Sequence, residues 1–178
     1  HLDAALEGCN LVLGASARRR GIHCAELDPR ACAQQALNIS RNGQVALVFG
    51  REHSGLTNEE LDRCHFMVRI PANPDYSSLN LAAAVQVLCY ELRMATELAD
   101  DTVDNVIAND TTPAPAQEME RFYQHLQEVL LDLGFLNPSN PRHLMRRLRR
   151  LYGRALPDQN EVNILRGMLS AVQTSKRS

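Results

Sequence analysis

The segment Gln44-Val-Ala-Leu-Val-Phe-Gly-Arg-Glu-His-Ser-Gly-Leu-Thr-Asn-Glu-Glu60 contains the signals that decide the fold class. An apolar run follows the turn Asn42-Gly43, and it predicts a strand over residues 44–49 in a sheet that is covered on both faces. The strand ends at Gly50. Thr57 and Glu60 then form a capping box, which predicts the start of a short helix. Strand, glycine loop and helix in this order indicate an α/β unit.

Similar signals lie on both sides of this segment. We expect a strand over residues 10–14, a helix from Asp28-Pro29 to about residue 38, a strand over 66–70 and a long helix over 79–98. Short apolar strands that alternate with helices predict a parallel sheet. Residues 1–98 are therefore interpreted as one α/β domain.

The long helix carries an apolar stripe. Its members recur at helical spacing and are Leu81, Val85, Leu88 and Leu92. Such a stripe most often packs into the core of its own domain, and a subunit interface is the less common alternative.

Residues 99–116 differ in composition from both neighbouring segments. Four aspartates precede Thr111-Thr-Pro-Ala-Pro-Ala116, which indicates an acidic linker that contains proline. Residues 117–178 then show helical apolar patterns throughout. Three helices of this length lie near the lower limit for an independent core, so we expect this module to pack on the first domain or on a second subunit.

The composition excludes several classes of protein. Hydrophobic residues make up 44% and charged residues 22% of the 178 residues, which are values of a globular protein rather than a disordered one. Neither a membrane span nor a signal peptide is visible. The five cysteines form no Cys-x-x-Cys pair, and His23-Cys24 has no partner pair at zinc-finger spacing. We expect no metal site and a cytoplasmic location.

The net charge of −2 conceals an uneven distribution. Residues 1–116 contain 9 basic and 15 acidic side chains, whereas residues 117–178 contain 10 basic and 6 acidic ones. A run without Asp or Glu carries the arginines Arg142, Arg146, Arg147, Arg149, Arg150 and Arg154. On a helix these arginines lie opposite Leu144, Leu148 and Leu151. This pattern favours contact with nucleic-acid phosphates, while an acidic protein partner or a merely solvated face are the alternatives.

Three loops follow predicted strands and contain glycine or polar residues. They span residues 14–18, 49–56 and 70–80. Because ligands of α/β sheets bind at the carboxyl ends of the strands, these loops predict a ligand site. The sequence contains neither the Gly-x-Gly-x-x-Gly nor the Gly-Lys-Ser/Thr phosphate signature, and no Gly-x-Ser-x-Gly elbow, so the residues alone leave the ligand unknown.

Two long motifs in these loops resemble a known family. They are Leu47-Val-Phe-Gly-Arg-Glu-His-Ser-Gly-Leu-Thr-Asn-Glu-Glu60 and Ile70-Pro-Ala-Asn-Pro-Asp-Tyr-Ser-Ser-Leu-Asn-Leu-Ala82, supported by the Gly14-Ala-Ser-Ala-Arg18 loop and by Asn163-Ile-Leu-Arg-Gly-Met168 near the carboxyl end. They resemble the SPOUT class of RNA methyltransferases, within it the SpoU-type ribose 2′-O-methyltransferases, and most closely the bacterial TrmJ family that modifies tRNA. The resemblance covers essentially the whole chain.

The resemblance implies a fold and a cofactor. The fold would be an α/β domain with a carboxy-terminal trefoil knot, which is very rare among proteins. S-adenosylmethionine would lie bent in the knot, held mainly by backbone groups. Carried onto this sequence, the cofactor contacts would be Ala15, Ser16, Ala17, Gly50, Ile70, Ser77, Ser78 and Leu79.

The resemblance also implies the reaction and its residues. A ribose 2′-hydroxyl of tRNA, a cytidine or uridine at nucleotide 32 of the anticodon loop, would attack the sulfonium methyl. Glu52, Ser78 and Asn80 would be the polar catalytic-motif residues, and the alternative for Glu52 is a structural ion pair with Arg51 or another arginine. The RNA-binding set would comprise Arg18, Arg51, Arg142, Arg146, Arg147, Arg149 and Arg150.

Two further expectations follow from the resemblance. The enzymes act as homodimers whose active site is completed across the subunits, so the 79–98 helix becomes an interface candidate. Their first motif, an Asn-x-Gly-type loop followed by an arginine thought to activate the ribose hydroxyl, would precede His1 together with an opening strand and helix. The alternative functions are a non-catalytic RNA-binding protein that retains the knot and a regulatory module whose arginine helix binds DNA or protein.

Overall fold

The computed structural model describes residues 1–17, 25–73, 75, 78–100, 112–139, 141 and 143–177. Its centre is a four-stranded parallel sheet with the strand order β2-β4-β1-β3. The strands are β1 (Cys9–Ala15), β2 (Ala25–Leu27), β3 (Gln44–Phe49) and β4 (Phe66–Val68). The predicted parallel α/β sheet is confirmed. The three predicted strands are present, and β2, which lacks an apolar run, was not predicted.

Strand β3 differs from its prediction in burial. It occupies one edge of the sheet, and its apolar residues are half-buried rather than buried. Alternate residues of the central strand β1 pack on opposite faces, as strand geometry requires. Leu11 and Leu13 belong to one core cluster with Leu88, whereas Val12 belongs to a second cluster with Cys64.

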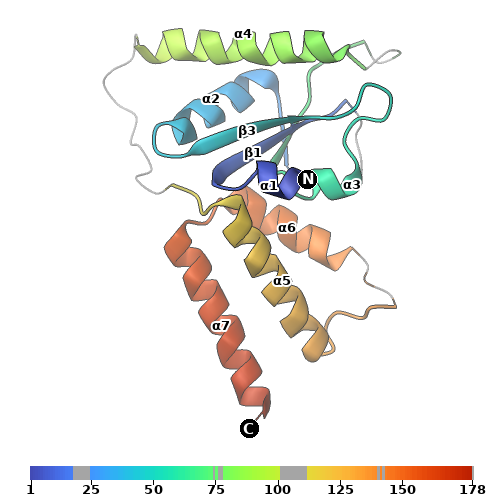
Figure 1. The fold of residues 1–178 in the computed structure, drawn as a ribbon, viewed down its shortest axis with the longest axis vertical. Helices are drawn as coiled ribbons and strands as arrows, with labels where there is room; N and C mark the ends of the chain where they lie inside the picture. Colours follow the sequence, from blue (N-terminus) through green and yellow to red (C-terminus); the bar gives the residue numbers. More distant parts are fainter. Residues whose placement is uncertain are drawn as a thin grey trace.

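Helices cover both faces of the sheet. Figure 1 shows α2 (Pro29–Ser40) and α4 (Leu81–Asp100) stacked on one side, with α5 (Ala116–Asp132), α6 (Leu144–Ala155) and α7 (Gln159–Arg177) on the other. Two short helices, α1 (Leu2–Ala5) and α3 (Asn58–Leu61), lie at the sheet. The caps match the sequence signals, since Asp28 accepts a hydrogen bond from the Ala31 amide and Thr57 with Glu60 forms the capping box.

The middle of the apolar stripe of α4 packs into the core. Leu88 is 2% exposed and Leu92 packs against the same cluster, whereas Leu81 is 39% exposed. The stripe as a whole is therefore not the free face of the helix. Large apolar side chains on the rest of its surface are Tyr90 and Leu98, which are 57% and 61% exposed.

The segment just before α5 is packed, and it forms the end of the range 99–116 for which the sequence predicts a linker. Ala114 is buried, its amide donates to the Pro157 carbonyl at 2.8 Å, and the Asn10 side chain donates to the Pro113 carbonyl at 2.7 Å. Residues 101–111 lie outside the described residues. Residues 112–116 thus join the helical module to the sheet, because their short apolar side chains and backbone find partners on both.

The three carboxy-terminal helices share a core around Phe122 and Val162. The apolar face of α6 differs from the predicted one, since Leu151 is 45% exposed while Met145, Leu148 and Tyr152 pack inward. The Tyr152 ring meets Phe122 edge-on at 4.9 Å between centroids. The face is rotated because α6 packs against α5 on one side and against the α/β part on another. The trefoil knot stays a prediction.

Candidate active site and nucleic-acid interface

The three predicted loops meet at the carboxyl edge of the sheet. Since β1, β3 and β4 are parallel, their ends lie at the same edge, and the loops enclose a cleft of about 170 Å³. Every described residue of the predicted cofactor set lines this cleft: Ala15, Ser16, Ala17, Gly50, Ile70, Ser78 and Leu79. Ser77 lies outside the described residues.

The backbone comes unusually close at Gly50. A Cβ atom on Gly50 would lie 2.1 Å from the Gly55 carbonyl carbon and 2.3 Å from the Leu56 nitrogen. The segment between them is a small hairpin, in which the Gly55 amide donates to the Arg51 carbonyl at 2.8 Å. Gly55 has φ +67°, a conformation that glycine adopts without strain. The two glycines of the motif thus fold this hairpin against the end of β3.

Further residues of the cleft were not predicted. Apolar or small walls come from Phe49, Leu56, Val68, Leu81 and Ala84, and the hairpin adds the polar His53 and Ser54. The available signal was their position, since they lie at strand ends, in the 49–56 loop or in the first turn of α4, beside the predicted residues.

Two of the predicted catalytic residues meet across different loops. The Asn80 side-chain amide donates to a Glu52 carboxylate oxygen at 3.4 Å. Asn80 also starts α4, because its Oδ1 accepts from the Ala82 amide and its carbonyl from the Ala84 amide. Ser78, the third predicted catalytic residue, lines the same cleft. The structure therefore brings a carboxylate, an amide and a hydroxyl to one cavity, while their roles stay predictions.

Arg51 does not pair with Glu52. Its guanidinium donates to both carboxylate oxygens of Glu60, at 3.0 and 3.3 Å. The Thr57 amide and the Arg51 guanidinium hydrogen bonds lower the pKa of Glu60 below its ordinary value. The alternative of an ion pair between Glu52 and Arg51 is therefore wrong, because the Arg51 guanidinium pairs with Glu60.

The arginines of α6 divide into two groups. Arg149 donates to both carboxylate oxygens of Glu120 at 2.7 and 2.9 Å and lies 4.3 Å from the centroid of the Tyr123 ring. Arg146 donates to Asp62 at 3.2 Å. The expectation of a cationic face without compensating acids is therefore wrong for these two, because the acids come from α5 and from the α/β part.

The other arginines of the helix face solvent. Arg147, Arg150 and Arg154 are exposed and form no ion pair within the described part of the chain. Their spacings of three and four residues place them along one stripe of α6. Arg18 and Arg142, also in the predicted RNA-binding set, lie outside the described residues.

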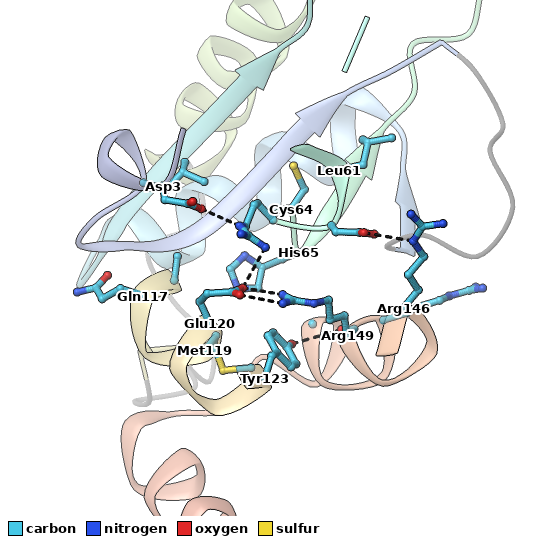
Figure 2. A pocket seen from close by; sticks show the side chains of 16 residues that line it. Asp3, Leu61, Cys64, His65, Gln117, Met119, Glu120, Tyr123, Arg146 and Arg149 are labelled. Carbon is cyan, nitrogen blue, oxygen red and sulfur yellow. Dashed lines mark hydrogen bonds and ion pairs between the residues drawn. The ribbon is translucent and has the colours of Figure 1, made fainter. Parts of the chain in front are cut away.

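The paired arginines belong to a second cavity, of about 150 Å³, between the sheet and the carboxy-terminal helices (Figure 2). Arg63 donates to Asp3 at 2.7 Å and approaches Glu120 to 3.2 Å, so Glu120 is shared by Arg63 and Arg149. Burial raises the pKa of Glu120, but the Arg149 hydrogen bonds and the charges of Arg149 and Arg63 outweigh this effect and lower the pKa.

His65 also lines this cavity. Its Nδ1 accepts a hydrogen bond from the Val12 amide at 3.0 Å, which requires that this nitrogen carries no proton. Burial lowers the pKa of His65 to about 4, so the ring is neutral near pH 7. Gly153 of α6 packs on it, since a Cβ there would lie 3.6 Å from the His65 carbonyl oxygen.

Comparison with known proteins identifies the family of the α/β part and of the carboxy-terminal helices. The model of the SpoU rRNA methylase family matches residues 12–90, and the model of the C-terminal domain of the tRNA methyltransferase TrmJ matches residues 117–178. A tRNA (cytidine/uridine-2′-O-)-methyltransferase TrmJ of Cronobacter sakazakii is 50% identical over 98% of this chain and 72% of its own length. The chain belongs to the TrmJ family.

Other TrmJ relatives agree. A tRNA (cytidine/uridine/adenosine-2′-O-)-methyltransferase TrmJ of Pseudomonas aeruginosa is 52% identical over 99% of this chain and 71% of its own length. The crystal structure of TrmJ from Z. mobilis ZM4 superimposes with a TM-score of 0.79 at 28% identity, covering 97% of this chain and 71% of that one. The predicted family is thereby confirmed.

Within the described ranges no group of three or more His, Cys, Asp or Glu residues is placed to hold a metal ion. No helix in the same part of the chain has the length and the apolar character that a membrane crossing requires.

Proposed function

We propose that this chain transfers a methyl group from S-adenosylmethionine to a ribose 2′-hydroxyl of tRNA. The observation that carries the proposal is the 50% identity over 98% of the chain to a protein named as a tRNA (cytidine/uridine-2′-O-)-methyltransferase. The cleft supports it, because the described residues expected to contact the cofactor surround a single cavity. The substrate we propose is cytidine or uridine at nucleotide 32 of the anticodon loop.

The lining of the cleft fits S-adenosylmethionine. Small residues and exposed backbone at Ala15–Ala17 and Gly50 leave room for main-chain hydrogen bonds to the ligand. Leu56, Ile70 and Leu79 supply apolar walls for an adenine ring. The Glu52 carboxylate lies at the same cavity, where it can balance a positive sulfonium.

The chemistry requires a positioned hydroxyl more than a strong catalyst. S-adenosylmethionine, when bound, supplies an electrophilic methyl group. The residues of this chain would hold the ribose in line with it, with Asn80 and Ser78 as hydrogen-bond partners and Glu52 fixed by Asn80 at 3.4 Å. The enclosing hairpin would limit the access of water to the reacting atoms.

The tRNA would be held by the exposed arginines. Arg147, Arg150 and Arg154 present guanidinium groups along one stripe, and guanidinium groups form paired hydrogen bonds with phosphate oxygens. Arg146 and Arg149 are already bound to carboxylates of this chain, so their contribution to tRNA affinity would be smaller.

The proposal includes the assembly and the setting expected from the family. We propose a homodimer in which the exposed part of α4, including Leu81, Tyr90 and Leu98, meets a second copy. The trefoil knot, the division into domains over 1–98 and 117–178, and a cytoplasmic location belong to the same proposal.

The test is transfer of a labelled methyl group from S-adenosylmethionine to tRNA transcripts. It should use this chain, and this chain extended ahead of His1 by the amino-terminal segment of a TrmJ relative. Label should enter a transcript with cytidine or uridine at nucleotide 32 and not one with a 2′-deoxyribose there. Glu52→Gln should lower the rate at least tenfold, while the matched variant Glu59→Gln, on the exposed side of α3, should leave it unchanged.

Two results would contradict the proposal. If neither protein labels any RNA although both bind tRNA and S-adenosylmethionine, the chain is a non-catalytic RNA-binding protein with the same fold. If label enters the transcript that carries the 2′-deoxyribose as fully as the normal one, the proposed target is wrong.

A further inference from the structure

The hairpin Arg51–Gly55 is a wall of the cleft that lacks apolar anchoring. Its two main-chain hydrogen bonds join Arg51 and Gly55, at 2.8 and 3.3 Å. The side chains of residues 51–54 are exposed, and one of them is Glu52, the proposed catalytic carboxylate. Two hydrogen bonds and no buried side chain leave such a hairpin weakly held on its own. Something outside residues 51–54 must therefore hold it in place.

Helix α3, next along the chain, is firmly anchored. Leu61 at its end is fully buried in a cluster with Leu56 and Met67. Thr57 caps its start through hydrogen bonds with Glu60 in both directions, at 2.7 and 3.2 Å. Glu60 is therefore a carboxylate at a fixed position beside the hairpin.

The Glu60 carboxylate joins these two elements. It accepts the bidentate hydrogen bonds of Arg51 at 3.0 and 3.3 Å while accepting the Thr57 amide at 2.7 Å. A bidentate arginine–carboxylate pair fixes orientation as well as distance. The base of the hairpin is thus tied by a side chain to a helix that the core holds.

We propose that Glu60 is a positioning residue of the cofactor cleft. By holding the Arg51 side chain it keeps the hairpin closed on the cleft and Glu52 beside Asn80. Arg51 then serves the geometry of the cleft instead of binding an RNA phosphate. The consequence for ligand binding rests on the proposed function, whereas the effect on the hairpin does not.

The variant Glu60→Gln separates the two functions of this side chain. Glutamine serves equally in a capping box, so the Thr57 hydrogen bonds persist, but its amide group cannot accept both Arg51 donors. The chain contains a matched control, because Glu161 forms the same capping box with Asp158 at 2.8 and 2.9 Å and has no arginine partner in the described structure. Glu161→Gln therefore repeats the chemical change without the ion pair.

Two measurements on the full chain test the proposal. Amide hydrogen exchange over residues 50–56 should become at least fivefold faster in Glu60→Gln and stay unchanged in Glu161→Gln. Calorimetric titration with S-adenosylhomocysteine, the product of the cofactor, should show five- to tenfold weaker binding in Glu60→Gln. Arg51→Gln should have the same two effects. The double variant should show the same exchange rate and affinity as either single variant, since both substitutions remove the same ion pair.

The outcomes are distinct. Unchanged exchange in Glu60→Gln would overturn the proposal, and so would a loss of tRNA affinity in Arg51→Gln that Glu60→Gln does not share. If the unaltered chain binds no S-adenosylhomocysteine, the proposed function fails, and the exchange measurement alone then supports or overturns the positioning of the hairpin.

Discussion

The cleft at the carboxyl edge of the sheet and the joint between the sheet and the carboxy-terminal helices enclose similar volumes, about 170 and 150 Å³, but they are built differently. The cleft lies between the loops that follow β1, β3 and β4 and the start of α4, and backbone and small residues at Ala15–Ala17 and Gly50 alternate with apolar walls. The joint is formed by long charged side chains around Glu120, which links Arg63 and Arg149. In this protein close backbone approach shapes the cleft and one ion pair ties its hairpin, whereas a cluster of ionic side chains forms the contact between the two parts.

This difference predicts opposite sensitivities. In the cleft, added volume at Gly50 should cost more stability than the loss of a charge. The joint should lose stability when the Glu120 carboxylate is removed or when His65 is protonated, and less when volume is added at its rim. Four measurements test this comparison.

The largest effect is expected in the cleft. Gly50→Ala would place a methyl group 2.1 Å from the Gly55 backbone, so the hairpin must move, and we expect a loss of about 3 kcal/mol in the free energy of unfolding. Gly167→Ala in α7 meets nothing within 4 Å and should instead raise stability by about 1 kcal/mol. Urea unfolding of both variants measures the two changes. If both variants changed stability by a similarly small amount, the backbone of Gly55 would have room for a methyl group at Gly50.

The next effect is a dependence of stability on pH at the joint. The unfolded chain protonates His65 below its ordinary pKa of 6.5, whereas the folded chain does so near 4. The unfolded state therefore binds more protons between these values, so stability falls as the pH drops from 6.5 to 4, by about 3 kcal/mol from this residue.

The variant His65→Asn keeps an acceptor for the Val12 amide but carries no titrating ring. Unfolding measured from pH 7 to pH 4 should show a smaller loss of stability for this variant than for the unaltered chain. An identical pH dependence would assign the acid sensitivity to other groups.

A smaller loss is expected when the joint loses a charge. Glu120→Gln leaves Arg63 and Arg149 without their shared carboxylate, and because these groups are partly exposed we expect a cost of about 2 kcal/mol. Glu128→Gln, at an exposed position of the same helix, should cost nothing measurable. Thermal unfolding compares the two. A similar Tm for both variants would show that the joint does not depend on the ionic cluster.

The smallest effects sharpen the distinction between joint and surface. Each of Arg147→Ala, Arg150→Ala and Arg154→Ala should reduce the slope of log affinity for tRNA against log salt by about 1, with stability unchanged. Arg146→Ala should alter that slope less and lower the Tm, because it breaks the ion pair with Asp62. Filter binding at several salt concentrations measures the slope. Equal slopes for all four variants would contradict the division of these arginines into an ion-paired group and an exposed, tRNA-binding group.

Much of the fold could be predicted from local signals. The strand at Gln44–Phe49, the helix capped by Asp28 and the capping box of Thr57 appear where the sequence predicts them. Each depends on residues a few positions apart, so a pattern in the sequence captures it. Strand β2 was missed because its three residues Ala25–Leu27 contain no apolar run, and its place is given by pairing with β4.

The candidate site also has features that the sequence predicted and features that it did not. Its cleft residues were predicted because parallel strands bring their following loops to one edge, and because the motifs resemble those of a family. The pairing of Arg51 with Glu60, nine positions apart, and of Arg149 with Glu120, twenty-nine apart, was not predicted. A helical wheel shows which face of α6 is cationic, but not which acids on other elements approach that face.

The sequence by itself determined the alternation of strands and helices, the helix caps, the glycine loops and the arginine run, since each is a property of neighbouring residues. The tertiary structure alone decided which arginines remain exposed, which carboxylate holds the hairpin and that residues 112–116 pack against the sheet. The physical reason is that charge pairing and burial depend on distances between segments far apart in the chain, and those distances exist only after the chain has folded.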